Sequence, residues 1–203
     1  MNITLVRHCE VDERYKNCYN GHNDIGLSKN GELQAKELAK KLDMSEFDAV
    51  FCSDLRRAKE TLRHSLHPKS TSSLSLTAHV KDATYTYMLR EKSWGRHEGM
   101  SFDEIVAKEN IQYIDFLQWI KALDGEPYEE YIKRVKEFFL DYLPSLDKEN
   151  ILVVTHAGVI RVLISIVNKI SLEEAFCIKI ENGSLILYDT QNKNFTKEKN
   201  EDI

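Results

Sequence analysis

The sequence predicts an α/β fold: a mainly parallel central sheet with helices on both faces and a helical insert in the middle of the chain. Two observations predict it. Short apolar runs at residues 3–6, 49–52 and 151–155 have the composition of strands that are buried on both faces. Stretches with helical spacing follow these runs, and an alternation of strands and helices favours parallel pairing.

The first elements can be placed from caps and spacing. Ser28 is expected to cap a helix after a polar loop that follows the first strand. The apolar face of this helix is predicted to consist of Leu33, Leu38, Ala39 and Leu42. The run 49–52 ends at Ser53 and leads into a helix through Arg57, and the Ser/Thr-rich residues 69–77 are expected to form a loop.

The middle of the chain is predicted to be helical. Ser101 and Glu104 have the spacing of a capping box, and further helices are expected near residues 112–123 and 128–142. The insert, about residues 85 to 145, is expected to lie over one sheet edge or over the functional site. A last helix begins near Gly158, and a late strand covers residues 184–188.

Residues 1–190 are expected to form a single domain, and residues 191–203 a polar C-terminal tail that frays. The chain has 203 residues and a net charge of -5, which argues against nucleic acid as a partner. No apolar run approaches the ~20 residues that cross a bilayer. Four cysteines without a C-x-x-C spacing are expected to be free thiols in a reducing cytoplasm. We therefore expect a cytoplasmic protein, monomeric or homodimeric, without a membrane partner.

Chemically active residues follow three of the predicted strands. Arg7 and His8 come directly after the first, Arg57 follows the second, and His156 follows the strand 151–155. Ligands of open α/β sheets bind at the carboxyl ends of the strands, so we expect these side chains to converge there. His156 would then donate a hydrogen bond to an anionic group bound between the arginines.

This set of residue types suits phosphoryl transfer, which needs charge neutralisation, an in-line nucleophile and a proton for the leaving oxygen. Arg7 and Arg57 can clamp phosphoryl oxygens through their planar donor forks. His8 can attack as a neutral imidazole, because the ordinary pKa of histidine is near 6.5. Ala157 lies at the start of a predicted helix, where its backbone N–H can bind an anion. Glu91 can protonate the leaving alkoxide and later activate water.

Four ordered motifs, at residues 5–8, 53–58, 91–99 and 155–161, together resemble the histidine phosphatase superfamily, in the branch that includes cofactor-dependent phosphoglycerate mutases. The resemblance implies a sheet with helices on both faces and a reaction without a metal or other cofactor. It implies that His8 is the nucleophile and forms a phosphohistidine, and that Glu91 is the general acid. The phosphate pocket that it implies consists of Arg7, Arg57 and His156.

Within the family, residues 18–28 and 125–128 look like the corresponding segments of α-ribazole phosphatases, the second lying near a Gly-Glu-Ser motif of those enzymes. The implied function is a metal-independent phosphomonoesterase acting on a small phosphorylated metabolite, with α-ribazole 5′-phosphate as a candidate. Asn20 and Gly21 are expected to contact the substrate. Two positions depart from the family: Cys9 replaces a usual Gly, and Arg14, a further expected substrate contact, replaces a frequent Asn.

Other functions remain open at this stage. A phosphoglycerate mutase would share the fold, although the chain is short for one. A tyrosine-phosphatase-like mechanism at Cys9 would need five residues before the next arginine, and Arg14 follows after four. Metal-dependent chemistry lacks a motif such as H-E-x-x-H. A non-catalytic module that binds a phosphorylated ligand would not need a nucleophile, clamps and an acid at once.

Overall fold

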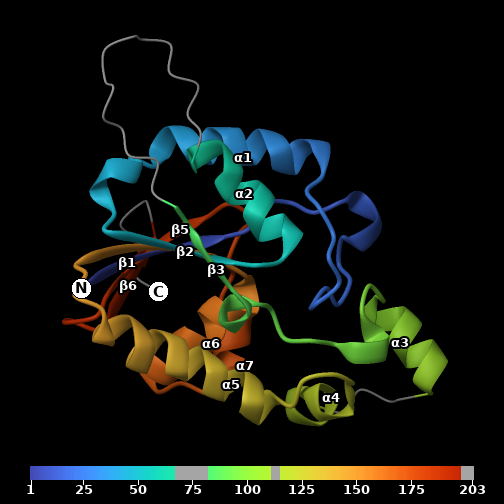
Figure 1. The fold of residues 1–203 in the computed structure, drawn as a ribbon. Coiled ribbons are helices and arrows are strands. Elements are labelled where there is room, and N and C mark those ends of the chain that lie inside the picture. The colour runs from blue at the N-terminus through green and yellow to red at the C-terminus, as the bar shows by residue number, and fades with distance from the viewer. Residues whose placement is uncertain (67–81, 111–114, 198–203) are drawn as a thin grey trace.

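The computed structural model describes residues 1–66, 82–110 and 115–197. In this part of the chain six strands form one mixed sheet in the order β3-β2-β4-β1-β5-β6 (Figure 1). The strands are β1 (Asn2–Arg7), β2 (Ala49–Ser53), β3 (Thr84–Thr86), β4 (Asn150–Thr155), β5 (Leu185–Asp189) and β6 (Asn194–Lys197). β1, β2, β3 and β4 pair in parallel, and β5 and β6 add to the β1 edge antiparallel. The predicted α/β fold with a mainly parallel sheet is confirmed.

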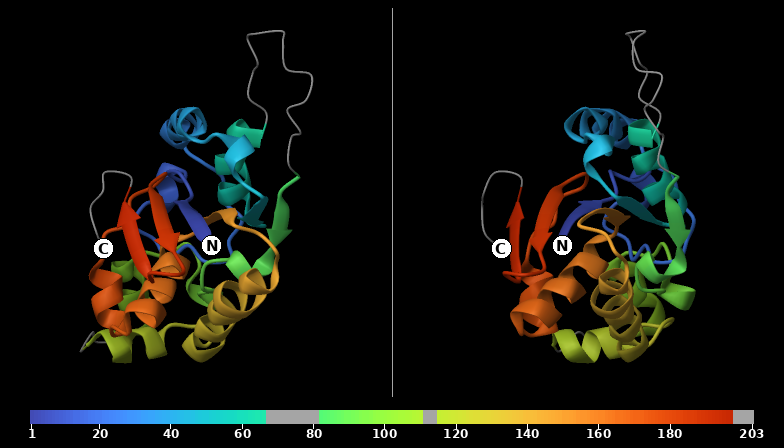
Figure 2. Two further views of the ribbon diagram at one scale, coloured as in Figure 1. Left: turned by 90° about the vertical axis from the view of Figure 1, so that its left-hand side faces the viewer. Right: turned by 60° about the vertical axis from the view of Figure 1, so that its left-hand side comes forward.

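Helices cover both faces of the sheet (Figures 1 and 2). The helices are α1 (Lys29–Lys41), α2 (Arg56–Leu66), α3 (Phe102–Glu109), α4 (Phe116–Ala122), α5 (Tyr128–Lys136), α6 (Ala157–Asn168) and α7 (Leu172–Cys177). α1 and α2 lie on one face, and α5, α6 and α7 on the other. α5 continues as a π-helical segment, Glu137–Tyr142. Among the residues described, no helix is long and apolar enough to cross a membrane.

The central strands lack polar alternation because both of their faces are buried. In β1, Ile3 and Leu5 belong to the core under α5 and α6, whereas Val6 belongs to the core under α1 and α2. In β4, Val153 and Val154 divide between the two cores in the same way. Each core excludes apolar surface from water, which contributes roughly 25 cal/mol per Å².

Caps define two helix starts where the sequence predicts them. The Ser28 hydroxyl accepts from the N–H of Gly31, and Ser101 forms the predicted capping box with Glu104. The predicted apolar face of α1 is wrong at Leu33, which is 59% exposed. The buried residues of this helix are Gly31, Ala35 and Leu38. Residues two apart on a helix do not share a face, so a stripe through Gly31 leaves Leu33 on the outer side.

Part of the predicted insert, residues 85 to 145, belongs to the central layers of the fold. α5 belongs to the helical layer itself, with Tyr131 and Val135 fully buried in the core, and β3 adds an edge strand that the sequence analysis did not predict. α3 and α4 lie beside the layers rather than in them (Figure 1). The predicted loop 69–77 and the start of the helix predicted from residue 112 lie outside the described residues.

The prediction of a frayed tail from Gln191 is wrong for residues 194–197, which form the edge strand β6. Phe195 in this strand is fully buried and stacks on Tyr188 with ring centroids 4.4 Å apart. Phe195 is the buried residue of β6, and β5 supplies both the strand with which β6 pairs and the aromatic partner of Phe195.

Candidate active site

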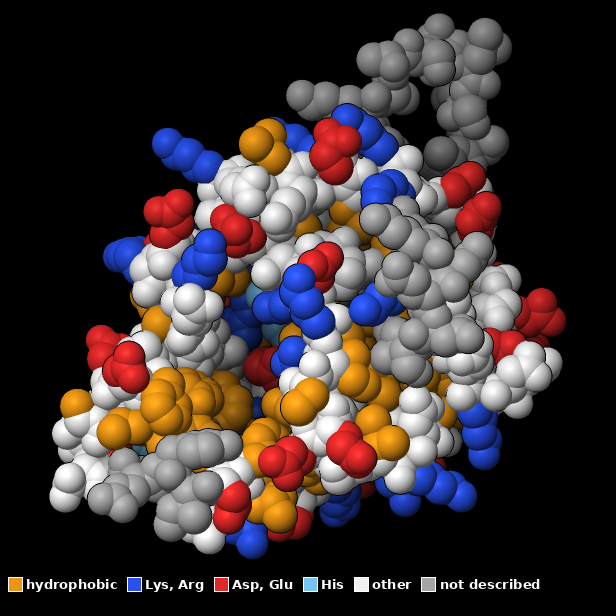
Figure 3. All heavy atoms as spheres, turned by 180° about the vertical axis from the view of Figure 1, so that it is seen from behind, with side chains coloured by type: hydrophobic (Ala, Val, Ile, Leu, Met, Phe, Trp, Pro, Cys, Tyr) orange, Lys and Arg blue, Asp and Glu red, His pale blue; other side chains and the backbone are white. Residues whose placement is uncertain are grey.

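A pocket of about 420 Å³ opens at the carboxyl ends of β1 and β4, within the usual range for small-ligand sites. The residues that line it include Arg7, His8, Glu91, Ala157 and Gly158. Figure 3 shows a hollow with Lys or Arg, His and acidic side chains gathered in it and apolar side chains beside it. The structure thus brings together the predicted nucleophile, one clamp, the predicted acid and a helix N-terminus.

Hydrogen bonding fixes the tautomer of His8. Its Nδ1 lies 2.8 Å from the carbonyl oxygen of Cys9, which can only accept, so Nδ1 carries the proton and Nε2 keeps its lone pair. Burial, followed by the charges of Arg57 and Arg7, lowers the pKa of His8 well below its ordinary value. His8 is therefore a neutral imidazole, the form that a nucleophile requires.

The backbone around His8 is also held in place. Asn182, which lies in the loop before β5, donates from Nδ2 to the His8 carbonyl at 3.0 Å. The N–H of Gly183 donates to the carbonyls of Arg7 and His8. The loop before β5 therefore extends the β1 pairing and fixes the direction in which the histidine projects.

Arg7 is oriented but not fully paired. Its Nη1 donates to the carbonyl of Ile180, and its buried Nε has no hydrogen-bond partner among the described residues. An unpaired buried N–H is costly, so this donor suits an acceptor bound in the pocket. Burial, and then the charge of Arg161, lowers the pKa of Arg7. The arginine is thus suited to an anionic group beside His8.

Arg57 and His156 lie together behind the pocket. Both are fully buried, and Arg57 donates from Nε to His156 Nδ1 at 3.3 Å. His156 must then carry its proton on Nε2, which donates to Ser53 Oγ at 2.8 Å. The rings of His156 and His8 are 5.1 Å apart at their centroids. Burial and the charge of Arg57 hold the pKa of His156 well below its ordinary value.

Arg57 also holds the loop that borders the pocket. Its guanidinium donates to the carbonyls of Asn20, Gly21 and Asn23. The predicted direct contacts of Arg57 and His156 with a phosphoryl group stay predictions, because neither side chain lines the pocket in this structure. What the structure adds is a buried pair beside His8, of which Arg57 holds residues 20–23 in place.

The two predicted loop contacts differ. Asn20 lines the pocket, and its side chain donates to the Tyr15 carbonyl at 2.6 Å. Gly21 lies outside the pocket lining, and its N–H donates to Glu98 Oε2 at 2.7 Å. A Cβ on Gly21 would overlap the Lys92 carbonyl, so glycine is needed here for close packing of two loops.

Glu91 is held by three donors. Its Oε1 accepts from the Tyr131 hydroxyl at 2.6 Å and from the N–H of Lys92 at 3.0 Å, and its Oε2 accepts from the N–H of Gly158 at 2.9 Å. The carboxyl group therefore has a defined position at the N-terminus of α6. Burial and Glu91 together hold the pKa of Tyr131 well above its ordinary value, so this hydroxyl stays a donor.

The two departures from the family pattern do not face the pocket. Arg14 is mostly exposed, pairs with Asp12 at 3.1 Å, and lies outside the pocket lining. Cys9 is fully buried against α1 and α2, and burial raises the pKa of its thiol to about 11. A buried, protonated thiol is a poor nucleophile, so the structure favours His8 over Cys9.

Several further residues line the pocket. An aromatic wall consists of Tyr19, Trp94, Tyr128 and Phe176, of which Tyr128 and Phe176 were not predicted from the sequence. Lys92 lies behind it, with Nζ 4.2 Å from the centroid of Trp94 and 5.3 Å from that of Tyr128, and burial lowers its pKa to about 8. Arg161 also lines the pocket, four residues after Ala157 on α6; that helical spacing was the available signal.

Metal-ligating side chains are not grouped in the described part of the chain: no three His, Cys, Asp or Glu residues lie close enough together to hold an ion. The site described so far is built from arginines, two histidines, one carboxylate and backbone N–H groups. Of these groups, Arg7, His8, Glu91 and Ala157 line the pocket, where they can act on a phosphoryl group directly.

The sequence model of the histidine phosphatase superfamily (branch 1) matches residues 3–202, so the chain belongs to this family. Family members are phosphatases and mutases that act on phosphorylated small molecules, and this chain is an enzyme of that family.

Individual relatives differ in substrate. The chain is 30% identical over 165 residues to a probable phosphatase (C1687.21) of Schizosaccharomyces pombe, covering 80% of this chain and 71% of the relative. It is 27% identical to a 2,3-bisphosphoglycerate-dependent phosphoglycerate mutase of Bartonella henselae, covering 92% and 90% of the two chains. The crystal structure of the alpha-ribazole phosphatase from Shigella flexneri superposes with a TM-score of 0.78 at 25% identity, over 98% and 95% of the chains.

Proposed function

We propose that this chain is a metal-independent phosphomonoesterase that works through a phosphohistidine on His8. The observation that carries the proposal is the tautomer of His8: its Nδ1–H is committed to the Cys9 carbonyl, so the lone pair is on Nε2, in a pocket shared with Arg7 and Glu91. A non-catalytic binding module would have no need of this arrangement.

In the first step, His8 Nε2 attacks phosphorus, and the bond between phosphorus and the ester oxygen breaks. The departing alkoxide takes the proton of the Glu91 carboxyl group and leaves as an alcohol. Arg7 and the N–H of Ala157 at the start of α6 offset the charge on the phosphoryl oxygens. The Nδ1–H bond to the Cys9 carbonyl stabilises the positive charge that phosphorylation places on the ring.

In the second step, the Glu91 carboxylate takes a proton from water, and the water oxygen attacks phosphorus. The bond between phosphorus and Nε2 breaks, inorganic phosphate leaves, and His8 returns to its neutral form. Glu91 ends the cycle protonated, ready for the next leaving group. The tautomer of His8 is unchanged throughout, because Nδ1 never releases its proton.

The substrate we favour is a small metabolite whose leaving group carries a flat ring, and α-ribazole 5′-phosphate is the first candidate. Tyr19, Trp94 and Tyr128 supply aromatic surface on which such a ring can stack. Trp94 is braced edge-on by Tyr19, with centroids 5.1 Å apart, so the wall keeps its shape. The solved alpha-ribazole phosphatase supports this choice through its likeness in fold.

The test is phosphate release, in the presence of EDTA, from α-ribazole 5′-phosphate, 3-phosphoglycerate, phosphoserine and a sugar phosphate. We expect release to resist the chelator and to be fastest with α-ribazole 5′-phosphate. Conversion of 3-phosphoglycerate to 2-phosphoglycerate after priming with a bisphosphorylated donor, without net release, would establish a mutase instead. Loss of all release in EDTA would overturn the metal-independent mechanism.

A further inference from the structure

The segment that carries Glu91 is held by an arginine that does not touch the pocket. Arg134 on α5 donates from Nη1 to the carbonyls of Met88 and Arg90, at 2.9 and 2.8 Å, and from Nη2 to the carbonyl of Glu91 at 3.1 Å. One side chain thus binds three carbonyl oxygens of the segment that runs from the 3-10 turn Tyr87–Leu89 to Glu91.

Arg134 is itself locked in place. It forms a two-pronged ion pair with Glu126, with Nε–Oε1 at 2.6 Å and Nη2–Oε2 at 2.8 Å, and both side chains are largely buried. Its guanidinium carbon lies 4.7 Å from the ring centroid of Tyr131. A paired, stacked and buried guanidinium has little rotational freedom, so it fixes what it binds.

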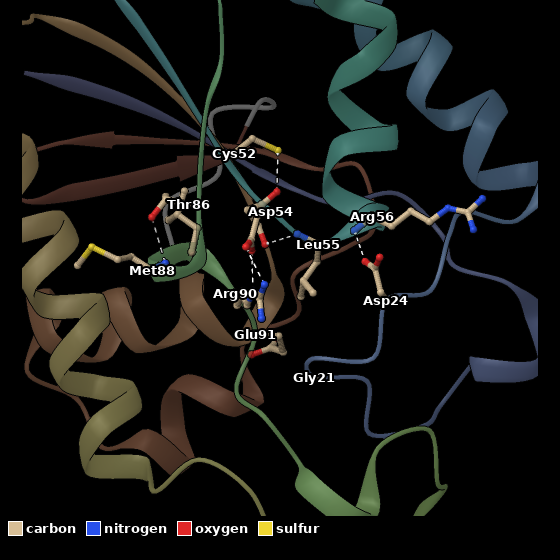
Figure 4. Close-up of polar contacts among 12 residues, drawn as sticks. Gly21, Asp24, Cys52, Asp54, Leu55, Arg56, Thr86, Met88, Arg90 and Glu91 are labelled. Carbon is tan, nitrogen blue, oxygen red and sulfur yellow. Dashed lines mark hydrogen bonds and ion pairs between the residues drawn. The ribbon is translucent and has the colours of Figure 1, made fainter.

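The same helix also holds the Glu91 side chain. Tyr131 is one turn before Arg134 on α5, and its hydroxyl donates to Glu91 Oε1. α5 therefore fixes both ends of Glu91: the backbone through Arg134 and the carboxyl group through Tyr131. From the other side, Arg90 pairs with Asp54 at 2.6 and 2.7 Å, directly beside Glu91 (Figure 4).

We propose that Arg134 is a positioning residue for Glu91, and that Glu126 anchors it. The inference rests on the proposed role of Glu91 as the general acid. The inference assigns a role to the segment 125–128. Gly125 packs closely against the Ser93 backbone, and Glu126 pairs with Arg134, eight residues later in the chain. Glu126 and Arg134 therefore act on proton transfer without touching the substrate.

The test compares Arg134→Lys and Glu126→Gln with Glu91→Gln on two substrates. One substrate, an alkyl phosphate, needs a proton for its leaving oxygen; the other, 4-nitrophenyl phosphate, does not. Lysine keeps the charge but cannot reach three carbonyls and Glu126 at once. The rate compared is kcat/KM, which reports only the steps up to release of the alcohol, because Glu91 also acts in the later hydrolysis step that both substrates share. Because a displacement of about 1 Å can cost about 10²-fold in rate, we expect kcat/KM for the alkyl phosphate to fall tenfold or more. For 4-nitrophenyl phosphate we expect kcat/KM to fall by about threefold or less.

The double variant Arg134→Lys/Glu91→Gln separates positioning from general damage. If Arg134 acts through Glu91, the lysine variant adds no further loss on the alkyl phosphate once Glu91 is gone. Arg63→Lys is the control, since Arg63 on α2 pairs with Glu32 on α1, donating from Nη2 to both carboxylate oxygens at 3.0 Å, and neither residue lines the pocket. We expect this control to leave both rates unchanged.

Two results would overturn the inference. Equal slowing of both substrates by Arg134→Lys and Glu126→Gln would show general structural damage, and full additivity with Glu91→Gln would show an effect independent of Glu91. A different result would contradict the proposed function: an equal fall in kcat/KM for both substrates in Glu91→Gln itself. In that case Glu91 would not be the acid, whatever Arg134 does.

Discussion

Gly158→Ala is the most informative single change, because it adds one methyl group at the contact between α6 and Glu91. A Cβ at this position would overlap Glu91 Oε1 and would lie 2.8 Å from both Glu91 Cδ and the Tyr131 hydroxyl oxygen. The backbone at Gly158 is helical, so alanine is compatible with its conformation. The substitution therefore displaces the carboxyl group without straining the helix.

The size of the effect follows from the distances. To reach an ordinary separation of roughly 3.5 Å or more, the carboxyl group must move by about 1 Å, which breaks the 2.9 Å bond from the Gly158 N–H. Such a misplacement costs about 10²-fold in rate. A lost bond to a charged group costs about 1.5–3 kcal/mol, and alanine in a helix returns about 1 kcal/mol. The net loss in the free energy of unfolding is about 0.5–2 kcal/mol.

The assay is kcat for an alkyl phosphate, with the melting temperature measured on the same preparation. We expect a loss of about 10²-fold in rate with a fall in melting temperature of about 5 °C. Gly26→Ala is the control, because a Cβ there meets only the side-chain ends of Glu60 and Arg56. If Gly158→Ala retained most of the wild-type rate, the observed position of Glu91 would be irrelevant to catalysis.

Three further predictions test separate parts of the account. Cys9→Ser is expected to keep at least half of the wild-type kcat, since the thiol is buried and its pKa is raised to about 11. A tenfold loss of kcat in a folded variant would instead support Cys9 as the nucleophile. Phe195→Ala is expected to lower the free energy of unfolding by about 3 kcal/mol in urea titrations, with KM unchanged, because the ring is buried on Tyr188. An unchanged free energy of unfolding would show that β6 does not contribute to stability. Burial lowers the folded-state pKa of His8 and His156, so below pH ~6.5 the unfolded chain binds protons that the folded chain does not. Stability is expected to fall from pH 6.5 to 5.5 by up to about 1.4 kcal/mol for each histidine, and a His156→Asn variant should show a shallower fall; a flat wild-type profile would contradict the burial of these rings.

Strands and helix starts were predicted correctly where a sequence pattern has a single structural outcome. The apolar runs 3–6 and 151–155 formed buried parallel strands, and Ser28 and Ser101 capped helices. Because parallel strands end at one edge of a sheet, the sequence alone places Arg7 and His8 near the His156–Gly158 turn.

Partners that depend on packing could not be predicted. Nothing local to Tyr131, Arg134 or Asn182 distinguishes them from ordinary helix or loop residues, and their roles arise only when α5 and the loop before β5 meet the site. Arg57 illustrates the same limit: its type was noted, but its commitment to three loop carbonyls follows from full burial beside His156.

The covalent intermediate is the central claim, and rapid quenching of a turnover reaction tests it most directly. The quenched protein would be digested under alkaline conditions, which preserve phosphohistidine, and the phosphorylated peptide located by mass spectrometry. We expect one phosphoryl group on the peptide that contains His8, formed within the first turnover and absent in His8→Ala. Phosphate on another residue, or full turnover by the His8→Ala variant, would contradict the account.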